Sequence, residues 1–206
     1  TVPVHVVPQG VDTSRFRPGL EPLPIPGRRK FAFLSVFEWI HRKGWDALLR
    51  AWAEAFDAGA DVCLLIRSYL PNVTEGKSST AAINERIDEF LETQLGRKRD
   101  SVAPIIVLGE QLAQLDMPRL YASANCFVLP TRGEGWGRPF IEAMACGLPV
   151  IGTNWSAQRA FMHEKNSLLL DIEGLETVDE RMEFEFYRKH QWARPSAAHL
   201  KQLLCW

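Results

Sequence analysis

The stretch CFVLPTRGEGWGRPFIEAMACGLPVI, at residues 126–151, decides the fold. Its first four residues form a short apolar run, which a turn with three alternate glycines joins to a helical pattern. Pro139 is typical of the first turn of a helix, and Gly147 with Pro149 is typical of a helix end. A second apolar run follows at Leu148–Ile151. One unit of strand, turn, helix and strand is therefore predicted from this stretch.

Short apolar runs of the same kind recur along the chain. They are found at Phe31–Phe37, Val62–Ile66, Ile105–Leu108, Cys126–Leu129 and Leu148–Ile151. Continuous rather than alternating apolar residues are typical of strands buried on both faces, as in a parallel sheet. With helical patterns between them, they predict an α/β fold with a doubly wound, Rossmann-like parallel sheet of five or six strands. We expect the run at 126–129 to be central, with the glycine turn at its carboxyl end.

Two helical patterns outside the opening stretch support this alternation. After Gly44, apolar residues recur at helical spacing, and we expect them to face the core: Trp45, Leu48, Leu49, Trp52 and Phe56. On the same helix Asp46, Arg50 and Glu54 are expected to take the opposite side. A second helix is predicted to open at Asp116 and Pro118.

Other segments carry weaker patterns. Residues 67–80 have the composition of turns and no apolar periodicity, which predicts a mobile surface loop. Four prolines between residues 18 and 26 predict a stiff connector ahead of the first core strand. Beyond Asp171 the apolar pattern weakens, and only a short amphipathic piece precedes the end of the sequence.

Composition narrows the class of protein. A chain of 206 residues with 46% hydrophobic content can bury the core of one domain. Lys and Arg total 24 against 25 for Asp and Glu, so no general positive field draws the chain to nucleic acid or anionic lipid. Any anion site must therefore be local.

The cysteines and the apolar runs indicate in which cellular compartment the protein works. Cys63, Cys126, Cys146 and Cys205 stand far apart without a CxxC pair, and we interpret them as reduced core residues. No apolar run reaches the roughly 20 residues that a membrane-spanning helix needs, so no transmembrane segment is expected. These features predict a cytoplasmic protein.

The glycine turn is the strongest candidate for an anion site. Gly133, Gly135 and Gly137 let the backbone approach a ligand closely, and the helix start that follows favours a negative charge. A phosphate fits this position. Arg138, at the helix start, would contribute a cation there, or it would only pair with a neighbouring glutamate, Glu134 or Glu142.

Glu134 and Glu142 sharpen this prediction. They are eight residues apart, one in the turn and one in the first turns of the helix. A carboxylate accepts two hydrogen bonds from a vicinal diol, and a nucleotide sugar offers one diol on its sugar and one on its ribose. The alternative for Glu142 is that it only complements the helix dipole.

The sequence resembles the C-terminal domain of the family 4 glycosyltransferases, which have GT-B architecture. That domain carries a glutamate, seven residues and a second glutamate (an EX7E motif), in text similar to EGWGRPFIEAMACGLPVI at residues 134–151. The likeness runs from VVPQGVD at residues 6–12, through LYASA at residues 120–124, to about residue 170.

The resemblance implies roles for these residues. Glu134 would contact the hexose of a nucleotide-sugar donor, and Glu142 would bind the ribose hydroxyls. The backbone amides of Gly135, Trp136 and Gly137 would meet the hexose or the phosphates. Of the catalytic set, Glu134 would orient the hexose, while Lys43 and Arg138 would stabilise the departing nucleoside diphosphate.

The sequence departs from the family at SVFEWIHRKG, residues 35–44. Family members usually carry an arginine where Glu38 stands, and this arginine and the lysine matched by Lys43 hold the diphosphate. A carboxylate pointing inward at Glu38 would repel phosphate. Either Arg42 or Arg67 supplies the second cation, or Glu38 faces elsewhere. Lys43 itself is either part of the site or a solvated lysine ahead of a helix.

Neither a metal nor a cofactor is expected. The five histidines have no ligand-like spacing with the cysteines, and the nucleotide sugar is a substrate. Three tryptophans, Trp136, Trp155 and Trp192, could stack on a base or a sugar, although packing is the more ordinary role for each.

The resemblance also sets expectations for the whole protein. Residues 1–206 would form one donor-binding domain, with a core at about 28–172 and an extension at 173–206 that looks truncated. The N-terminal, acceptor-binding domain of a GT-B enzyme is missing from the sequence, so the chain alone is expected to be inactive. Its parent would be a retaining hexosyltransferase.

Two classes of function other than a transferase are compatible with parts of the sequence. The first is a non-catalytic nucleotide-sugar-binding or interaction module, which Glu38 and the missing domain would fit. The second is an NAD-dependent dehydrogenase, which the sheet permits. The dehydrogenase is disfavoured because no GxGxxG follows the first core strand.

Overall fold

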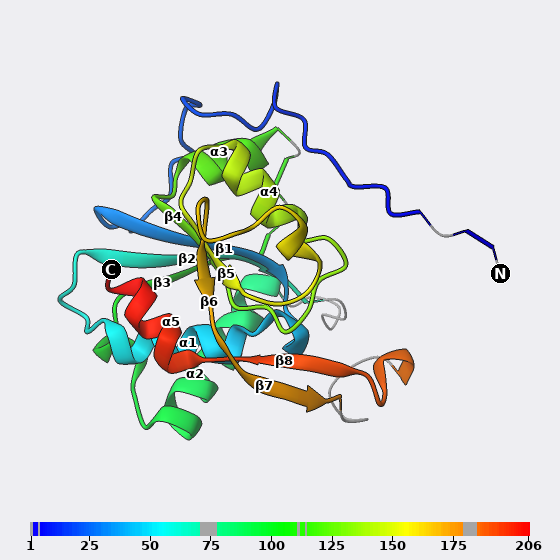
Figure 1. Cartoon of the computed structure of the whole chain (residues 1–206). Coiled ribbons are helices and arrows are strands. Elements are labelled where there is room, and N and C mark those ends of the chain that lie inside the picture. Colours follow the sequence, from blue (N-terminus) through cyan, green and yellow to red (C-terminus); the bar gives the residue numbers. More distant parts are fainter. Residues whose placement is uncertain (1, 4, 71–77, 111, 114, 179–184) are drawn as a thin grey trace.

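A six-stranded parallel sheet forms the centre of the protein (Figure 1). The computed structural model describes residues 2–3, 5–70, 78–110, 112–113, 115–178 and 185–206. The strands are β1 (Phe31–Glu38), β2 (Val62–Tyr69), β3 (Ile105–Leu108), β4 (Cys126–Leu129), β5 (Val150–Thr153) and β6 (Leu168–Leu170). Their order in the sheet is β3-β2-β1-β4-β5-β6, and every neighbouring pair is parallel. The predicted doubly wound, Rossmann-like α/β fold is confirmed.

Helices cover both faces of this sheet. The α-helices are α1 (Trp45–Ala55), α2 (Ser79–Leu95), α3 (Asp116–Ala122), α4 (Arg138–Ala145) and α5 (Ala197–Leu204). Short 3-10 helices occur at η1 (His41–Lys43), η2 (Arg99–Ser101), η3 (Ala157–Ala160) and η4 (Glu185–Tyr187). In Figure 1, α3 and α4 lie on one face, while α1, α2 and α5 lie on the other.

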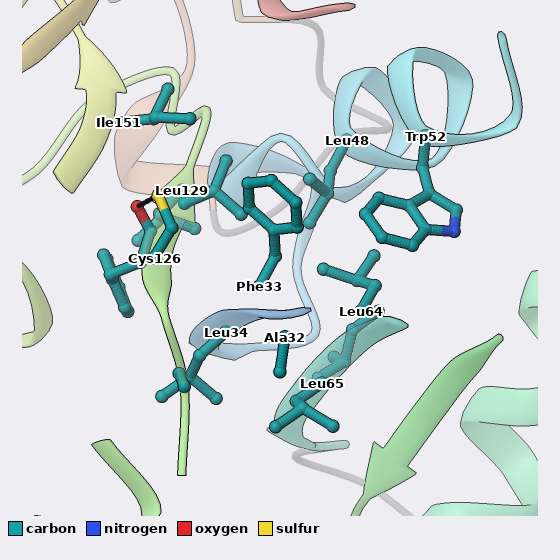
Figure 2. Close-up of a cluster of buried hydrophobic side chains, with 14 of the residues drawn as sticks. Ala32, Phe33, Leu34, Leu48, Trp52, Leu64, Leu65, Cys126, Leu129 and Ile151 are labelled. Carbon is teal, nitrogen blue, oxygen red and sulfur yellow. Dashed lines mark hydrogen bonds between the residues drawn. The ribbon is translucent and has the colours of Figure 1, made fainter. Parts of the chain in front are cut away.

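The core forms where the apolar runs of the strands meet these helices. Leu34, Leu64 and Phe127 are fully buried, as expected for strands covered on both faces. Figure 2 shows Phe33 of β1 beside Trp52 of α1, with ring centroids 5.7 Å apart in an edge-to-face contact. The predicted apolar stripe of the first helix is therefore core.

The strand order creates a switch point between β1 and β4. The chain runs outward from β1 to β2 and β3, then returns to β4 and runs outward in the other direction. The loops after β1 and β4 therefore leave the same edge side by side, where α/β sheets bind their ligands. β4 is central and the glycine turn follows its carboxyl end, as predicted.

Three local boundaries differ from the prediction. β2 continues to Tyr69, so Arg67 lies in a strand rather than in the predicted surface loop. Ser79 and Thr80 already belong to α2, and residues 71–77 of that loop lie outside the described residues. β5 begins at Val150 rather than Leu148, because the Leu148 N–H donates to the Ala143 carbonyl and thereby closes α4.

Residues beyond 171 form ordered elements despite their weak pattern. β7 (Ile172–Thr177) and β8 (Gln191–Pro195) pair as an antiparallel hairpin. Half-buried and exposed positions alternate along β7, so this strand has no continuous apolar run. α5 packs on α1 and buries Leu200 and Leu204 in the core.

The cysteine prediction holds for three of four thiols. Cys63, Cys126 and Cys146 are buried and free, and burial raises the pKa of the Cys126 thiol to about 12. The prediction is wrong for Cys205, which is exposed because it follows the last turn of α5. In the part of the chain that the structure describes, no helix has the length and apolar composition needed to cross a membrane.

Candidate functional site

The loops that follow β1 and β4 are held together at the switch point by close packing and hydrogen bonds. Gly44 has a φ of 70°, and a Cβ there would lie 1.9 Å from the Pro130 carbonyl oxygen, so only glycine fits. The backbone N–H of Arg132 donates to the Arg42 carbonyl at 2.7 Å, and the Thr131 hydroxyl donates to the same oxygen at 3.1 Å. These contacts fix the position of Lys43 relative to the glycine turn.

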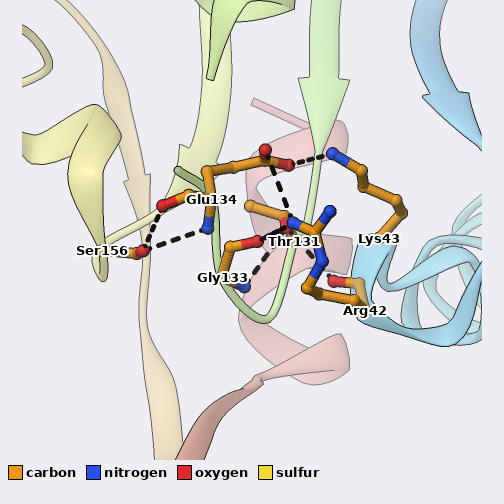
Figure 3. Close-up of polar contacts among 6 residues, drawn as sticks. All are labelled: Arg42, Lys43, Thr131, Gly133, Glu134 and Ser156. Carbon is orange, nitrogen blue, oxygen red and sulfur yellow. Dashed lines mark hydrogen bonds and ion pairs between the residues drawn. The ribbon is translucent and has the colours of Figure 1, made fainter. Parts of the chain in front are cut away.

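Lys43 and Glu134 form a buried ion pair across these two loops (Figure 3). The Lys43 Nζ lies 2.6 Å from Glu134 Oε1, and an Arg42 Nη lies 3.6 Å from the other carboxylate oxygen. The side chains of Lys43 and Glu134 are 11% and 7% exposed. Burial lowers the pKa of Lys43, and the charge of Glu134 opposes that shift. The alternative of a solvated Lys43 is therefore wrong.

Ser156 holds the backbone of Glu134 from the opposite side. The Ser156 hydroxyl accepts from the Glu134 N–H at 3.0 Å and donates to the Glu134 carbonyl at 2.8 Å (Figure 3). Ser156 has a φ of 77° and a ψ of −166°, a region that non-glycine residues rarely adopt. The turn is thus held on both sides, by Arg42 and Lys43 and by Ser156.

The rest of the turn leaves room for a ligand. Gly135 is exposed, and a Cβ there would meet nothing within 4 Å. Gly137 has a φ of 89° and lies directly before α4, where a Cβ would come within 2.9 Å of the Phe140 ring. Trp136 turns away, because its indole donates to the Gln9 carbonyl at 3.0 Å and its ring packs 5.6 Å from Phe161.

Glu142 lies on α4 and is held by a buried tyrosine. The Tyr121 hydroxyl of α3 donates to Glu142 Oε2 at 2.9 Å. An Arg138 Nη lies 3.4 Å from the other oxygen, so the pairing of Arg138 with Glu142 is observed. The Arg138 side chain is 70% exposed, whereas that of Glu142 is 12% exposed. Burial raises the pKa of Glu142.

A pocket of about 360 Å³ opens beside Lys43 and the start of α4. Glu38, Arg42, Lys43 and Arg67 all line this pocket, so Glu38 does not face away from the cations. Arg67 donates to the Leu108 carbonyl at 3.0 Å, and its Nε has no hydrogen-bond partner among the described residues. Burial lowers the pKa of Arg67.

Sequence reasoning missed the residue that holds the loop after β4. Arg132 is 6% exposed and bonds both oxygens of Asp46 at 2.8 Å each. It also donates to Glu176 of β7 at 2.8 Å. Asp46, expected on the side of its helix opposite the apolar stripe, is therefore the ion-pair partner of a buried arginine.

Tyr121 was missed as well. Its position within LYASA marked it as part of a helix, but its hydroxyl reaches Glu142 only because α3 packs on α4. Among the described residues, no cluster of three or more His, Cys, Asp and Glu side chains is arranged to hold a metal ion.

A parallel sheet whose loops meet at a switch point defines the class of doubly wound α/β domain, which binds its ligands beyond the carboxyl ends of the strands. The family model of the group 1 glycosyl transferases matches residues 28–182. The chain belongs to this family of glycosyltransferases, as the resemblance indicated.

Individual relatives agree with this assignment. The chain is 31% identical over 166 residues to a GDP-mannose-dependent monoacylated alpha-(1-6)-phosphatidylinositol monomannoside mannosyltransferase of Corynebacterium glutamicum, covering 73% of this chain and 39% of that protein. Three curated relatives are matched over 36%, 39% and 44% of their own length. The chain therefore spans less than half the length of these three relatives.

Solved structures share the fold at low sequence identity. The C-terminal domain of the group 1 family protein LpcC from Francisella tularensis superposes with a TM-score of 0.58 at 19% identity, covering 80% of this chain and 82% of that one. Anabaena Alr3699/HepE, solved in complex with UDP and glucose, superposes with a TM-score of 0.56 at 18% identity, covering 79% and 41%. The fold is thus that of the C-terminal domain of a glycosyltransferase.

Proposed function

We propose that residues 1–206 form the nucleotide-sugar-binding domain of a retaining hexosyltransferase whose donor is a nucleoside diphosphate hexose. The observation that carries this proposal is the arrangement at the switch point. The buried Lys43–Glu134 pair lies on one side of the α4 start, and Glu142, held by Tyr121, lies on the helix itself. One cation and two carboxylates around a helix start match the phosphates and the two diols of such a donor.

Each group then has a distinct task. The diphosphate lies in the pocket beside Lys43, against the N–H groups at the start of α4. Glu134 accepts hydroxyls of the hexose, and the open backbone at Gly135 admits that ring. Glu142 accepts the ribose hydroxyls through the oxygen that Tyr121 does not occupy.

The same groups support transfer. The bond between the anomeric carbon of the hexose and the diphosphate oxygen breaks, and a bond from that carbon to an acceptor hydroxyl oxygen forms while the hydroxyl proton passes to the leaving diphosphate. Negative charge develops on the nucleoside diphosphate as it leaves. Lys43, the exposed Arg138 and the amides before α4 stabilise that charge, since donors fixed in advance are most effective where charge develops. Retention of anomeric configuration is what the family resemblance implies.

We assign the second cation to Arg67. Arg42 is occupied by the turn, since it donates to the Gly133 carbonyl and contacts Glu134. Arg67 lines the pocket, and its Nε lacks a hydrogen-bond partner among the described residues. Because Glu38 lines the same pocket, we expect weaker donor binding than an arginine at that position would give.

The proposed class of enzyme also implies where the acceptor binds, whether a cofactor takes part and where the protein works. A separate domain would hold the acceptor, so the 206-residue chain binds the donor but transfers no sugar by itself. No cofactor takes part. The buried, free cysteines fit the reducing conditions of the cytoplasm.

Calorimetric titration of the chain with UDP, GDP and ADP tests the proposal. At least one diphosphate should bind, and Lys43→Ala should weaken it by about tenfold or more, because a charge-assisted contact contributes roughly 1.5–3 kcal/mol. Lys201→Ala is the matched control, since Lys201 is exposed on α5. Absence of binding for all three nucleotides, or equal affinity in Lys43→Ala, would contradict the proposal.

A further inference from the structure

The loop after β5 contacts the backbone of Glu134 through a single side chain, that of Ser156 (Figure 3). The Ser156 hydroxyl accepts from the Glu134 N–H at 3.0 Å and donates to the Glu134 carbonyl at 2.8 Å. Among the described residues, no other hydrogen bond reaches these two backbone groups. A Cβ at Gly135 would meet nothing within 4 Å, so the turn is open directly after Glu134. The position of the Glu134 backbone therefore depends on the Ser156 hydroxyl.

Ser156 makes these bonds from a backbone conformation that disfavours a side chain. A φ of 77° with a ψ of −166° lies in a region that almost only glycine adopts. Ser156 also directly precedes the 3-10 helix η3, where a serine hydroxyl ordinarily accepts from a helix N–H, but it forms no such capping bond. Because glycine would adopt this backbone without strain, the serine side chain contributes something that glycine lacks. The two bonds to Glu134 are that contribution.

The loop that carries Ser156 is anchored to the sheet. Gln158 of η3 is fully buried, and its side chain donates to the carbonyl of Thr153, the last residue of β5, at 3.1 Å. The Arg159 N–H donates to the Ser156 carbonyl at 3.1 Å. These contacts fix Ser156 relative to the sheet, so its hydroxyl ties the glycine turn to the end of β5.

The side chain of Glu134 is held from the other side of the turn. Lys43 Nζ lies 2.6 Å from Glu134 Oε1 and comes from the loop after β1. This ion pair fixes one carboxylate oxygen, whereas Ser156 fixes the backbone from which the side chain starts. A side chain fixed at both ends has few remaining conformations, so the second carboxylate oxygen is positioned before a ligand binds.

We propose that Ser156 is a positioning residue for the donor hexose. Its hydroxyl fixes the backbone of Glu134 so that the carboxylate meets the hexose hydroxyls, and it takes no part in binding the nucleotide. The described residues that line the Lys43 pocket, where the diphosphate lies, do not include Ser156. The inference rests on the proposed function for the role of Glu134, and it goes further by separating the affinity for the hexose from the affinity for the diphosphate.

Calorimetric titration of two variants of the 206-residue chain, Ser156→Ala and Ser156→Gly, tests this role. The ligand pairs are UDP with UDP-glucose, GDP with GDP-mannose and ADP with ADP-glucose. For the pair that binds, each variant should weaken the nucleotide sugar by about tenfold, because the hexose loses a well-placed charged acceptor. The affinity for the matching diphosphate should change by less than about twofold, because the Lys43 pocket is intact.

Thermal unfolding of the same variants separates positioning from stability. Ser156→Gly should unfold at a higher temperature than Ser156→Ala, because both variants lose the hydroxyl but only glycine relieves the strained backbone. A positioning role predicts the same loss of nucleotide-sugar affinity in these two variants of unequal stability. A loss that follows the unfolding temperature, with Ser156→Gly binding the nucleotide sugar as the parent does, would overturn the inference.

Ser101→Ala is the matched control. The Ser101 hydroxyl also accepts one bond, from Arg97 Nε at 3.1 Å, and donates one, to the Lys98 carbonyl at 2.8 Å, but it lies in η2 ahead of β3. Its loss should change neither affinity. Unchanged nucleotide-sugar affinity in both Ser156 variants, or equal weakening of the nucleotide sugar and its diphosphate, would overturn the inference and leave the proposed function. A parent chain that binds none of the three diphosphates would remove the proposed function and this inference with it.

Discussion

Replacing Glu142 by glutamine tests how much the negative charge of this carboxylate, proposed to bind ribose, contributes to nucleotide affinity. Tyr121 holds Oε2 at 2.9 Å, and the other oxygen pairs with the end of Arg138, a 70% exposed side chain that can swing aside. A ribose hydroxyl donating to a charged acceptor contributes about 1.5–3 kcal/mol, against about 0.5–1.5 kcal/mol for a neutral one. The difference predicts roughly tenfold weaker binding of a nucleoside diphosphate.

Calorimetry with a nucleoside diphosphate and its 2′-deoxy analogue measures this effect. The parent chain should prefer the ribonucleotide, and Glu142→Gln should lose most of that preference. Stability should change little, since the glutamine oxygen still accepts from Tyr121. Glu54→Gln, an exposed carboxylate on α1, is the control and should bind as the parent does. The reasoning is refuted if the parent binds both nucleotides equally and Glu142→Gln leaves the affinity unchanged.

Three further predictions follow from the site. Arg132→Met should lower the free energy of unfolding by about 3 kcal/mol in a denaturant titration, because it leaves the partly buried Asp46 and Glu176 without their cation. Arg194→Met, whose ion pair is half exposed, should lower it by under about 1 kcal/mol, and equal losses would contradict the role of the buried arginine. Arg67→Ala should weaken diphosphate binding by about tenfold, whereas Arg86→Ala, which removes an exposed arginine, should not. Unchanged diphosphate affinity in Arg67→Ala would indicate that Arg42, and not Arg67, is the second cation. Because burial raises the pKa of Glu142, the parent's affinity advantage over Glu142→Gln should be present above that raised pKa and should vanish as the pH falls through it. A ratio of the two dissociation constants that stays constant down to about pH 4.5 would count against this role of the Glu142 charge.

The central sheet could be predicted because its signals are local. Cys126–Leu129 is a continuous apolar run and Phe31–Phe37 is interrupted only by Ser35, as burial of a strand on both faces requires. The glycine turn could be predicted as well, because several glycines directly before a helix that begins with proline are typical of a turn. The pairing of β7 with β8 could not be predicted, because half-buried and exposed positions alternate along β7 over a short length.

The supporting residues of the site could not be predicted, for a different reason. Asp46 lies on the side of its helix opposite the apolar stripe, and its buried partner Arg132 comes from the loop after β4, far away in the sequence. The same holds for Tyr121, whose hydroxyl meets Glu142 through the packing of α3 on α4. Pairings between elements far apart in sequence depend on topology, which local patterns do not contain.

A crystal structure of the 206-residue chain with a bound nucleoside diphosphate tests the central claim most directly. The account predicts the diphosphate between Lys43 and the first amides of α4, with the ribose hydroxyls on Glu142 and an open space at Gly135 for the hexose. A nucleotide bound away from the β1–β4 switch point, or a diphosphate turned so that its ribose lies far from Glu142, would contradict it.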